Sequence, residues 1–472
     1  MVVGAGAAGL YVAWSAAELG ARVTLVSRKP LAESSSYWAQ GGLAAALAPD
    51  DSPQRHAEDT LNAGRGACRV AAVEVLAGEA PEAVAELQRL GVRFDLEPDG
   101  GLALGLEGGH SARRIVHAGG SETGRALTSR LAELVSTHPG IEVMEGASGE
   151  ALLGEEARCS GVITDRGAVA AAATVLATGG AAALWQRSTN PWGAIGAGAV
   201  LAHASGADLA DLEFCQFHPT ALALAGNRRD GALLTEAIRG EGAVLLDAAG
   251  RRFTDELAPR DQVTMAVLDR MAADERECVW LDMRSADPAR FPNVVAMLHE
   301  AGLDPSRAPV PVAPAAHYLM GGVVTDLNGH STLPGLFAVG ECACTGLHGA
   351  NRLASNSLSE CFVFGARAAE AAVAEPVVDA TNAASGPGWR FEPPTVETRR
   401  AIWAHAGPRR DAVGLTRLLA DPYPLARLIA ASALERRESR GAHRRSDHPR
   451  PDPAFDGVHI VCGADAAPRM ER

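Results

Sequence analysis

A glycine-rich turn between two apolar stretches constrains the fold of this chain more than any other feature. Gly4-Ala5-Gly6-Ala7-Ala8-Gly9 follows Val2-Val3, and a helical pattern then runs to Leu19 before a second apolar stretch over residues 21–26. This order of strand, G-x-G-x-x-G, helix and strand is typical of a dinucleotide-binding unit. Gly4 allows the tight turn, Gly6 the close approach of a pyrophosphate, and Gly9 the packing of the helix on the strand. The phosphates would lie at the helix N-terminus, where the dipole favours anions.

The end of the second strand departs from the usual nucleotide-binding pattern. Ser27 stands where an acidic residue usually binds the ribose, and Arg28 and Lys29 follow it. This departure counts against simple NAD binding. Residues 34–42 are rich in small hydroxyl side chains and glycine, a composition that fits either a cofactor-lining segment or a flexible surface loop.

Two later segments indicate that the nucleotide-binding unit is interrupted. Residues 175–180 and 335–341 both have the pattern of a strand that returns to the same sheet, and they lie far apart in the chain. The sequence therefore predicts an insertion from about Leu212 to Leu319. We expect a discontinuous first domain over residues 1–211 and 320–384, and a capping domain over residues 212–319.

The insertion carries the polar residues with the best claim to chemistry. His218 precedes Pro219, which favours an extended or turn conformation. Taken singly, each such residue has a structural explanation, because a lone histidine is usually a satisfied core residue and an arginine beside an aspartate is usually a local ion pair. The segments in question are Phe217-His218-Pro219-Thr220, Leu233-Leu234-Thr235-Glu236-Ala237, Arg239-Gly240-Glu241-Gly242, Ala258-Pro259-Arg260-Asp261 and Ala315-Ala316-His317-Tyr318.

Taken together, several blocks resemble one superfamily, that of the flavoprotein subunits of succinate dehydrogenase and fumarate reductase and of L-aspartate oxidase. The resemblance runs from residue 1 to about residue 445. It implies an α/β fold in which a Rossmann-like FAD-binding domain is interrupted by an α+β capping domain and followed by a C-terminal helical domain. The blocks are residues 35–42, 107–110, 217–220, 258–261, 316–318, 346–358 and Glu438-Ser439-Arg440-Gly441-Ala442-His443.

Two positions distinguish the branches of this superfamily. Succinate dehydrogenases attach FAD covalently to a histidine at the position of Ser35, so we expect non-covalent FAD here. Glu107 stands where the L-aspartate oxidases have a glutamate and the dicarboxylate enzymes an apolar residue, and a carboxylate can receive an α-ammonium group. The resemblance therefore favours oxidation of L-aspartate to iminoaspartate, with O2 (reduced to H2O2) or fumarate as acceptor, in the first step of NAD biosynthesis via quinolinate.

Two other functions stay open at this point. One is a fumarate reductase or succinate dehydrogenase-type subunit, and the other is a non-catalytic flavin-binding partner of the next enzyme. The expected partners are L-aspartate, the electron acceptor and, transiently, quinolinate synthase.

The resemblance also assigns residues to the substrate. Arg352 would clamp a carboxylate with two parallel hydrogen bonds, which lysine does less well. Arg260 corresponds to the family's proton donor or acceptor, and Glu107 would meet the ammonium. The remaining expected substrate contacts are His218, Thr235, His317, Gln216 and Ser355.

A longer set is assigned to FAD. Ser357 and Leu358 would begin a helix whose N-terminus faces the flavin. In a second departure from the family, Ala197 stands where aspartate oxidases often have aspartate, which removes one expected FAD contact. The expected FAD-binding residues are Gly4, Ala5, Gly6, Ala7, Ala8, Gly9, Arg28, Ser35, Ser36, Tyr37, Trp38, Ala39, Gln40, Gly41, Gly42, Glu341, Ser357 and Leu358.

Composition excludes some other functions. A net charge of −14 argues against a general nucleic-acid binder, which needs a basic face. The most apolar stretch, residues 168–185, is alanine-rich and interrupted by glycines, so we expect no membrane span. The eight cysteines show no C-x-x-C pair and no disulfide-framework spacing, so we expect reduced thiols, no metal site and a cytoplasmic location.

The C-terminal region is expected to be helical at first and then to lose order. Proline and glycine cluster over residues 385–394, which indicates a linker. Leu425, Leu428 and Ile429 lie on one face at helical spacing within an expected helical domain over residues 390–445. Residues 446–472 contain Pro449, Pro451 and Pro453 and no strong periodicity, so we expect an ordered-to-disordered tail that the family does not explain.

Overall fold

A five-stranded parallel sheet forms the centre of the molecule in a computed structural model, which describes residues 1–31, 33–155, 158–376, 392–463 and 467–472. Its strand order is β17-β10-β1-β2-β6. The three separated strand segments expected from the sequence therefore lie side by side, and the expected fold class is confirmed. The strands are β1 (Val2–Val3), β2 (Val23–Ser27), β6 (Ile141–Glu145), β10 (Thr174–Leu176) and β17 (Leu336–Ala338).

Alternating side chains of this sheet enter two different cores. Val2, Val175 and Phe337 pack into the core shared with the helices on one face. Val3 and Leu176 pack into the core on the other face. Both faces are buried, which is why these short strands read as continuous apolar runs rather than alternating ones.

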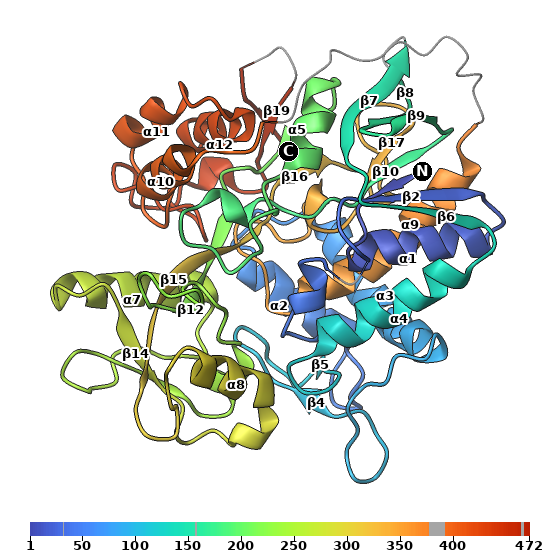
Figure 1. The fold of residues 1–472 in the computed structure, drawn as a ribbon. Helices are drawn as coiled ribbons and strands as arrows, with labels where there is room; N and C mark the ends of the chain where they lie inside the picture. The colour runs from blue at the N-terminus through green and yellow to red at the C-terminus, as the bar shows by residue number, and fades with distance from the viewer. Residues whose placement is uncertain (32, 156–157, 377–391, 464–466) are drawn as a thin grey trace.

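Helices and small sheets complete the first unit (Figure 1). One face carries α1 (Ala7–Glu18), α3 (Val70–Arg89), α4 (Thr123–Thr137) and α9 (Asn356–Ala374), with α2 (Pro53–Ala63) packed on α3. Near the opposite face lie α5 (Ala197–Ala204) and the hairpins of β7 (Gly149–Glu155), β8 (Arg158–Thr164) and β9 (Gly167–Ala170). A further small sheet contains β3 (Leu43–Ala44), β4 (Leu104–Gly105) and β5 (Ile115–Val116).

The inserted residues form a separate antiparallel sheet with its own hydrophobic core, at the lower left of Figure 1. Its strand order is β12-β15-β14-β13. All of its elements lie within residues 212–319, although the domain boundaries themselves stay a prediction. The elements are β12 (Cys215–Leu222), α6 (Ala237–Gly240), β13 (Val244–Leu246), α7 (Arg260–Ala273), β14 (Val279–Asp282), α8 (Pro292–Glu300) and β15 (Val310–Leu319).

The expectation of a disordered tail is wrong. Residues His459–Cys462 form β19, which pairs with β11 (Leu209–Ala210) in a sheet completed by β16 (Gly322–Val324), β18 (Ala343–Cys344) and β20 (Arg469–Glu471). Ile460 is fully buried in this position. The strand has only four residues and pairs with a segment about 250 positions earlier, so no local periodicity could reveal it.

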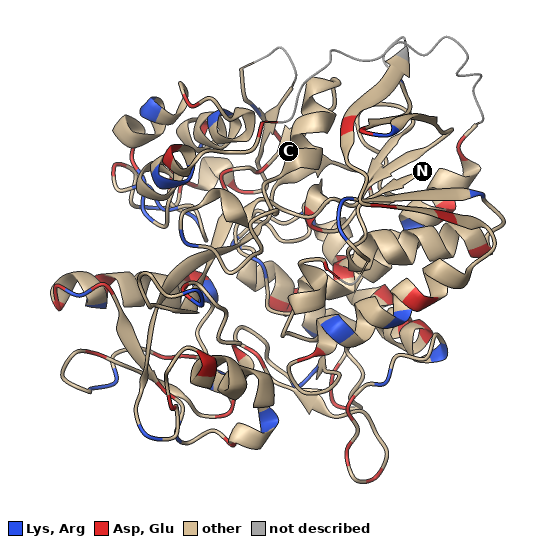
Figure 2. Ribbon diagram, in the orientation of Figure 1, with Lys and Arg blue, Asp and Glu red and all other residues tan. Residues whose placement is uncertain are grey.

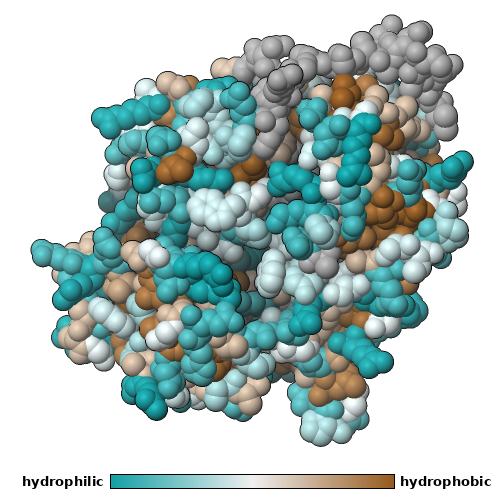
Figure 3. All heavy atoms as spheres, viewed as in Figure 1, coloured by the Kyte–Doolittle hydropathy of each residue, from teal (hydrophilic) through white to brown (hydrophobic). Residues whose placement is uncertain are grey.

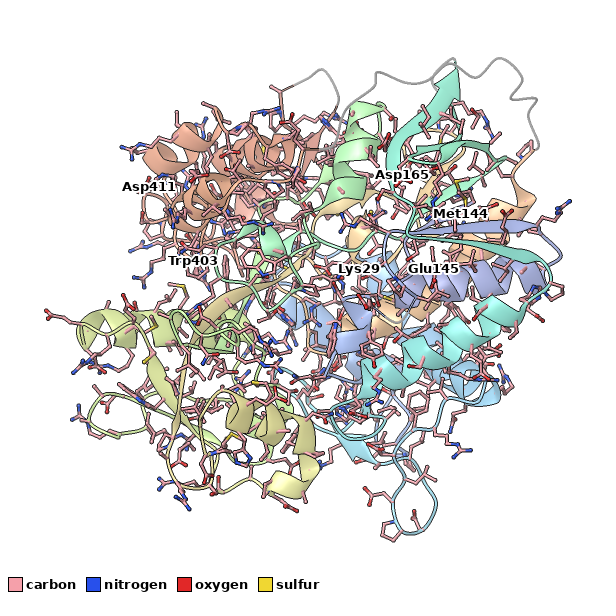
Figure 4. The ribbon with its side chains drawn as sticks, viewed as in Figure 1. Lys29, Met144, Glu145, Asp165, Trp403 and Asp411 are labelled. Atoms are coloured by element: carbon pink, nitrogen blue, oxygen red, sulfur yellow. The ribbon has the colours of Figure 1, made fainter. Side chains whose placement is uncertain are left out.

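The predicted helices of the C-terminal region are present, at the upper left of Figure 1. They are α10 (Val396–His405), α11 (Ala412–Leu418) and α12 (Pro424–Glu435). Leu425 and Ile429 are fully buried against the second face of the central sheet. Trp403 on α10 and Asp411, the N-cap of α11, are labelled in Figure 4. Of the expected linker, residues 385–391 lie outside the described residues.

The charged residues are interspersed over all parts of the molecule in the view of Figure 2, and the face shown in Figure 3 is mostly hydrophilic with separate apolar patches. Within the described ranges, no helix is both long and apolar enough to cross a membrane. No three His, Cys, Asp or Glu side chains among the described residues are grouped so that they could hold a metal ion.

Candidate active site

A cavity of about 790 Å³ runs from the carboxyl ends of the central strands to the space beneath the inserted sheet. The elements that line it come from both units, because the strands β1, β2, β10 and β17 all end at the same edge of the sheet. In open α/β sheets, ligands bind at this edge. Most of the residues expected to bind cofactor or substrate line the cavity, and Gly9, Tyr37 and Gln216 do not.

The first turn leaves no room for larger residues. Gly4 has φ +110°, and a Cβ there would lie 2.2 Å from the carbonyl oxygen of Ala177. A Cβ on Gly9 would lie 1.9 Å from the carbonyl oxygen of Gly4. Gly9 therefore permits the packing of α1 on the strand and is not a cavity residue. The N-terminus of α1 has no side-chain cap of its own, and the Ser36 hydroxyl accepts a hydrogen bond from the amide of Ala7 at 3.1 Å.

Polar and charged residues surround the nucleotide end of the cavity. Lys29, just beyond β2, and Asp165, between β8 and β9, line it and are labelled in Figure 4. Arg28 also lines the cavity and donates to the carbonyl of Gly193 at 3.4 Å. Trp38 lies at the cavity with 65% of its surface exposed, whereas Tyr37 packs edge-on against it outside the lining.

Glu341 lies deeper in the cavity, in an environment that raises its pKa to about 8 because burial disfavours the charged carboxylate. It accepts a hydrogen bond from the amide of Leu319 at 3.1 Å. Near it, Ser357 and Leu358 at the start of α9 also line the cavity, as expected.

Arg352 is a buried cation without a carboxylate partner among the described residues. Its Nη1 donates to the Ser357 hydroxyl at 3.1 Å, its guanidinium lies 4.7 Å from the centre of the Tyr318 ring, and its buried Nε has no partner. Burial and the nearby charge of Arg260 lower the pKa of Arg352 to about 10. An unpaired buried cation with free donors is suited to a carboxylate ligand.

Two neutral histidines stand beside the arginines. The ring centres of His218 and His317 are 5.1 Å apart. Burial and the charge of Arg260 hold the pKa of both imidazoles well below the usual range. The Nδ1 of His218 accepts from the amide of Thr220 at 3.3 Å, so its proton is on Nε2, which is free to donate to a ligand.

Arg260 is held in place from two sides. Its Nε is 2.6 Å from Oε2 of Glu236, and its Nη1 donates to Oε1 of Gln216 at 2.9 Å. The Nε2 of Gln216 in turn donates to the carbonyl of Arg352 at 2.8 Å. Gln216 therefore lies behind the two arginines and supports them, which corrects the expectation that it contacts substrate.

Glu107 lines the cavity beside Ser355. Its Oε2 accepts from the Ser355 hydroxyl at 2.7 Å, while its buried Oε1 has no hydrogen-bond partner among the described residues and lies 4.0 Å from Nε2 of His117. Ser355 and Thr235 also line the cavity. This end of the cavity thus carries a cation without a carboxylate partner, neutral donors and a carboxylate with one oxygen that accepts no hydrogen bond.

Sequence reasoning missed two residues of this site. Glu236 pairs with Arg260 and also accepts from the amide of Gly108 at 3.0 Å, and Tyr318 packs under Arg352. Both are adjacent to assigned residues, Thr235 and His317. The sequence offered no further signal for Glu236, because it does not show that the carboxylate faces Arg260 as its counter-charge.

Cys361 also lines the cavity, and it is one of eight free cysteines in the chain. Burial raises the thiol pKa of every one of the eight.

Comparisons with known proteins agree with this geometry. The family described as FAD binding domain matches residues 1–358, and the family described as fumarate reductase flavoprotein C-term matches residues 399–471. The second match includes the segment that was expected to lie outside the family pattern.

Full-length relatives are also found. An L-aspartate oxidase of Caulobacter vibrioides is 46% identical over 96% of this chain and 94% of its own length. One of Nostoc is 42% identical over 98% and 92%. Among solved structures, the flavoprotein of an E. coli quinol fumarate reductase has a TM-score of 0.89 at 28% identity, covering 100% of this chain and 95% of its own. A Mycobacterium smegmatis Sdh1 structure has a TM-score of 0.82 at 30% identity, covering 100% and 93%.

Proposed function

This chain belongs to the L-aspartate oxidase family of FAD-dependent flavoproteins, and from that premise we infer that it oxidises L-aspartate to iminoaspartate. The acceptor is O2, which is reduced to H2O2, or fumarate. The reaction is the first step of NAD biosynthesis via quinolinate. One observation carries the proposal: Glu107, with a carboxylate oxygen that accepts no hydrogen bond, lines the same cavity as Arg352, a cation without a carboxylate partner.

The cavity suits a ligand with two carboxylates and one ammonium group. Arg352 binds a carboxylate through its free donors. The uncharged side chains of His218, His317 and Thr235 form hydrogen bonds nearby. Glu107 receives the ammonium through Oε1. A dicarboxylate without an ammonium group leaves that buried carboxylate oxygen unpaired, which costs binding free energy.

The nucleotide end fits FAD. The tight turn at Gly4 and the N-terminus of α1, whose N-cap residue supplies no side-chain cap, provide a phosphate cradle. The carboxyl of Glu341, whose pKa is raised to about 8, provides a contact for a hydroxyl group. Ser35 offers no imidazole for covalent attachment, so the cofactor is held non-covalently. When bound, FAD would accept the two electrons of the substrate Cα–H bond as a hydride, while the nitrogen loses protons and the Cα–N bond becomes the imine double bond.

Arg260 acts as a charged positioning group in aspartate oxidation. A guanidinium is almost never deprotonated in proteins, and the carboxylate of Glu236 lies 2.6 Å from its Nε as a counter-charge. It therefore orients a substrate carboxylate and holds a proton that can be delivered when fumarate is reduced. A role as the base in the oxidative direction is not supported by this pairing.

Handover to quinolinate synthase follows from the chemistry of the product. An imine hydrolyses in water, so iminoaspartate needs prompt consumption by the next enzyme. A cytoplasmic location is supported by the eight free cysteines, since reduced thiols are typical of that compartment.

An anaerobic reduction experiment tests the function. The purified protein is supplied with FAD, and bleaching of the flavin absorbance is recorded with L-aspartate, D-aspartate and succinate. We expect bleaching by L-aspartate only. Bleaching by succinate and not by L-aspartate would establish a succinate dehydrogenase-type flavoprotein instead. Bleaching by none of the three would favour the non-catalytic flavin-binding partner.

A further inference from the structure

Two chain segments that are distant in sequence meet at Glu107, and they are joined at two points. The Glu107 side chain accepts from the Ser355 hydroxyl at 2.7 Å. Three residues later, Nε2 of His110 contacts the carbonyl of Ala354 at 2.9 Å. The loop over residues 107–110 is therefore fixed to the turn over residues 354–356 both at its carboxylate and at its far end.

The turn is strained and needs this support. Ser355 has φ +61°, a left-handed conformation that is unfavourable for residues other than glycine. Buried histidines contact the residues on both sides of Ser355. His110 contacts the Ala354 carbonyl, and Nε2 of His56 lies 2.8 Å from Oδ1 of Asn356. Strain of this kind persists only where the surroundings hold it.

His110 has a defined tautomer. A carbonyl only accepts, so the proton of the imidazole is on Nε2 and Nδ1 is an acceptor. Nδ1 faces Nη1 of Arg114 at 3.2 Å, and the Arg114 guanidinium is itself buried in ion pairs with Asp51 and Asp59. Burial lowers the pKa of His110 to about 3, so the ring stays neutral at physiological pH.

The base of the loop is anchored as well. Asp59 accepts hydrogen bonds from the amide of Ser111 at 2.8 Å and from its hydroxyl at 2.9 Å. The Arg114–Asp59 pair thus fixes the residue that follows His110, and no part of this network lines the cavity except Glu107 and Ser355.

We propose that His110 is a positioning residue for substrate selection, which holds the Glu107 loop against the Ser355 turn so that Oε1 of Glu107 faces the substrate ammonium. This inference rests on the proposed function. It explains why His110, which does not line the cavity, fixes the loop that carries Glu107, the residue proposed to select the substrate.

The carboxylate clamp follows the same turn in the chain but has additional contacts that do not involve His110. Arg352 is fixed by the Ser357 hydroxyl, by the Tyr318 ring and, through its carbonyl, by Gln216. Loss of the His110 contact therefore displaces the ammonium-binding oxygen and leaves the carboxylate-binding guanidinium in place. Binding of L-aspartate suffers, while binding of fumarate, which has no ammonium group, does not.

The test compares His110→Ala and His110→Gln with the wild type in the FAD-loaded enzyme. KM and kcat are measured for L-aspartate oxidation and for fumarate reduction with a reduced dye. We expect His110→Ala to raise KM for L-aspartate about tenfold and KM for fumarate by less than about twofold. His110→Gln, whose amide can donate to the Ala354 carbonyl, restores most of the loss.

Ser359→Ala serves as the matched control. Its buried hydroxyl lies one helical turn after Ser355 and donates to the Ala44 carbonyl at 2.8 Å, with no hydrogen bond to Glu107 or His110. We expect both of its KM values to stay near those of the wild type. A general loosening of this region would change the two substrates equally in every variant.

A second variant covers the case in which His110→Ala does not fold. Ser355→Gly relieves the left-handed backbone and removes only the hydroxyl contact, so it is expected to fold and to raise KM selectively for L-aspartate. Equal changes in both KM values, or no change in either, for His110→Ala or, where that variant does not fold, for Ser355→Gly would overturn the positioning role alone. A wild-type enzyme that L-aspartate cannot reduce would overturn the proposed function, and the positioning role with it.

Discussion

At the residue scale, the site is defined by polar atoms that the protein itself leaves unpaired. Oε1 of Glu107 and Nε of Arg352 are both buried and without hydrogen-bond partners among the described residues, and Oε1 lies 4.0 Å from Nε2 of His117. Such groups are costly in a folded protein unless a ligand satisfies them. A carboxylate and a guanidinium in one cavity therefore match a ligand that carries both an ammonium group and a carboxylate.

Glu107→Gln tests the ammonium contact directly. The amide has nearly the same shape and can still bond to Ser355, but it lacks the negative charge. We expect kcat/KM for L-aspartate oxidation to fall about 100-fold, since loss of a buried charged hydrogen bond costs about 1.5–3 kcal/mol, while fumarate reduction changes little. Steady-state kinetics in both directions measure this. Equal losses in both would show that Glu107 does not meet the ammonium.

Arg352→Lys tests the carboxylate clamp. Lysine keeps the charge but loses the planar fork and the packing on the Tyr318 ring. We expect the KM values for L-aspartate and for fumarate to rise together by at least about tenfold, because both ligands carry the carboxylate. The matched change distinguishes this variant from Glu107→Gln, and an effect confined to L-aspartate would contradict the assignment.

At the element scale, an element could be predicted from sequence when the segments that it contacts lie near it in the chain. The β1–α1–β2 unit was evident because its turn, helix and strands are contiguous. The short strand β19 was missed, because its register is set by β11 and by the ion pair between His459 and Asp211 at 2.6 Å. The proline-rich sequence before β19 argued against a strand there, and the strand forms because of its tertiary contacts.

Ile460→Ala tests whether β19 is part of the folded core. Ile460 is fully buried, so its truncation is expected to lower the free energy of unfolding by about 2–5 kcal/mol. Met470, its direct partner on β20, is 56% exposed, so Met470→Ala is the control with an expected change near zero. Urea denaturation of the two variants gives the comparison. Equal stabilities would mean that the C-terminal strands contribute no core.

At the scale of the whole molecule, much of the architecture but less of the site could be predicted from sequence. The interrupted sheet, the inserted sheet and the C-terminal helices follow from strand patterns and a family resemblance. The support of Arg260 by Gln216, and the pairing of Glu236 with both Arg260 and the Gly108 amide, could not be foreseen. They depend on which side of a buried residue faces the cavity, and residue type alone does not determine that.

Buried neutral histidines make the stability of the molecule depend on pH. Burial lowers the pKa of His56 to about 4 and that of His110 to about 3. The unfolded chain binds protons at these residues below pH about 6.5, whereas the folded chain does not, so stability is full above that pH and falls as pH decreases.

We therefore expect the free energy of unfolding to decrease between pH 6.5 and pH 4, with each such histidine contributing about 1.4 kcal/mol per pH unit. Urea denaturation at a series of pH values measures the slope. His56→Gln, which removes one of these groups, is expected to give a shallower slope. An unchanged slope in that variant would contradict the assignment of His56 to this effect.

The protonated thiols have a consequence for the lifetime of the enzyme. When O2 is the acceptor, hydrogen peroxide forms in a cavity lined by Cys361. Peroxide oxidises the thiolate rather than the thiol, and burial keeps all eight cysteines protonated. The protein thus carries little of the thiolate that would react with its own by-product.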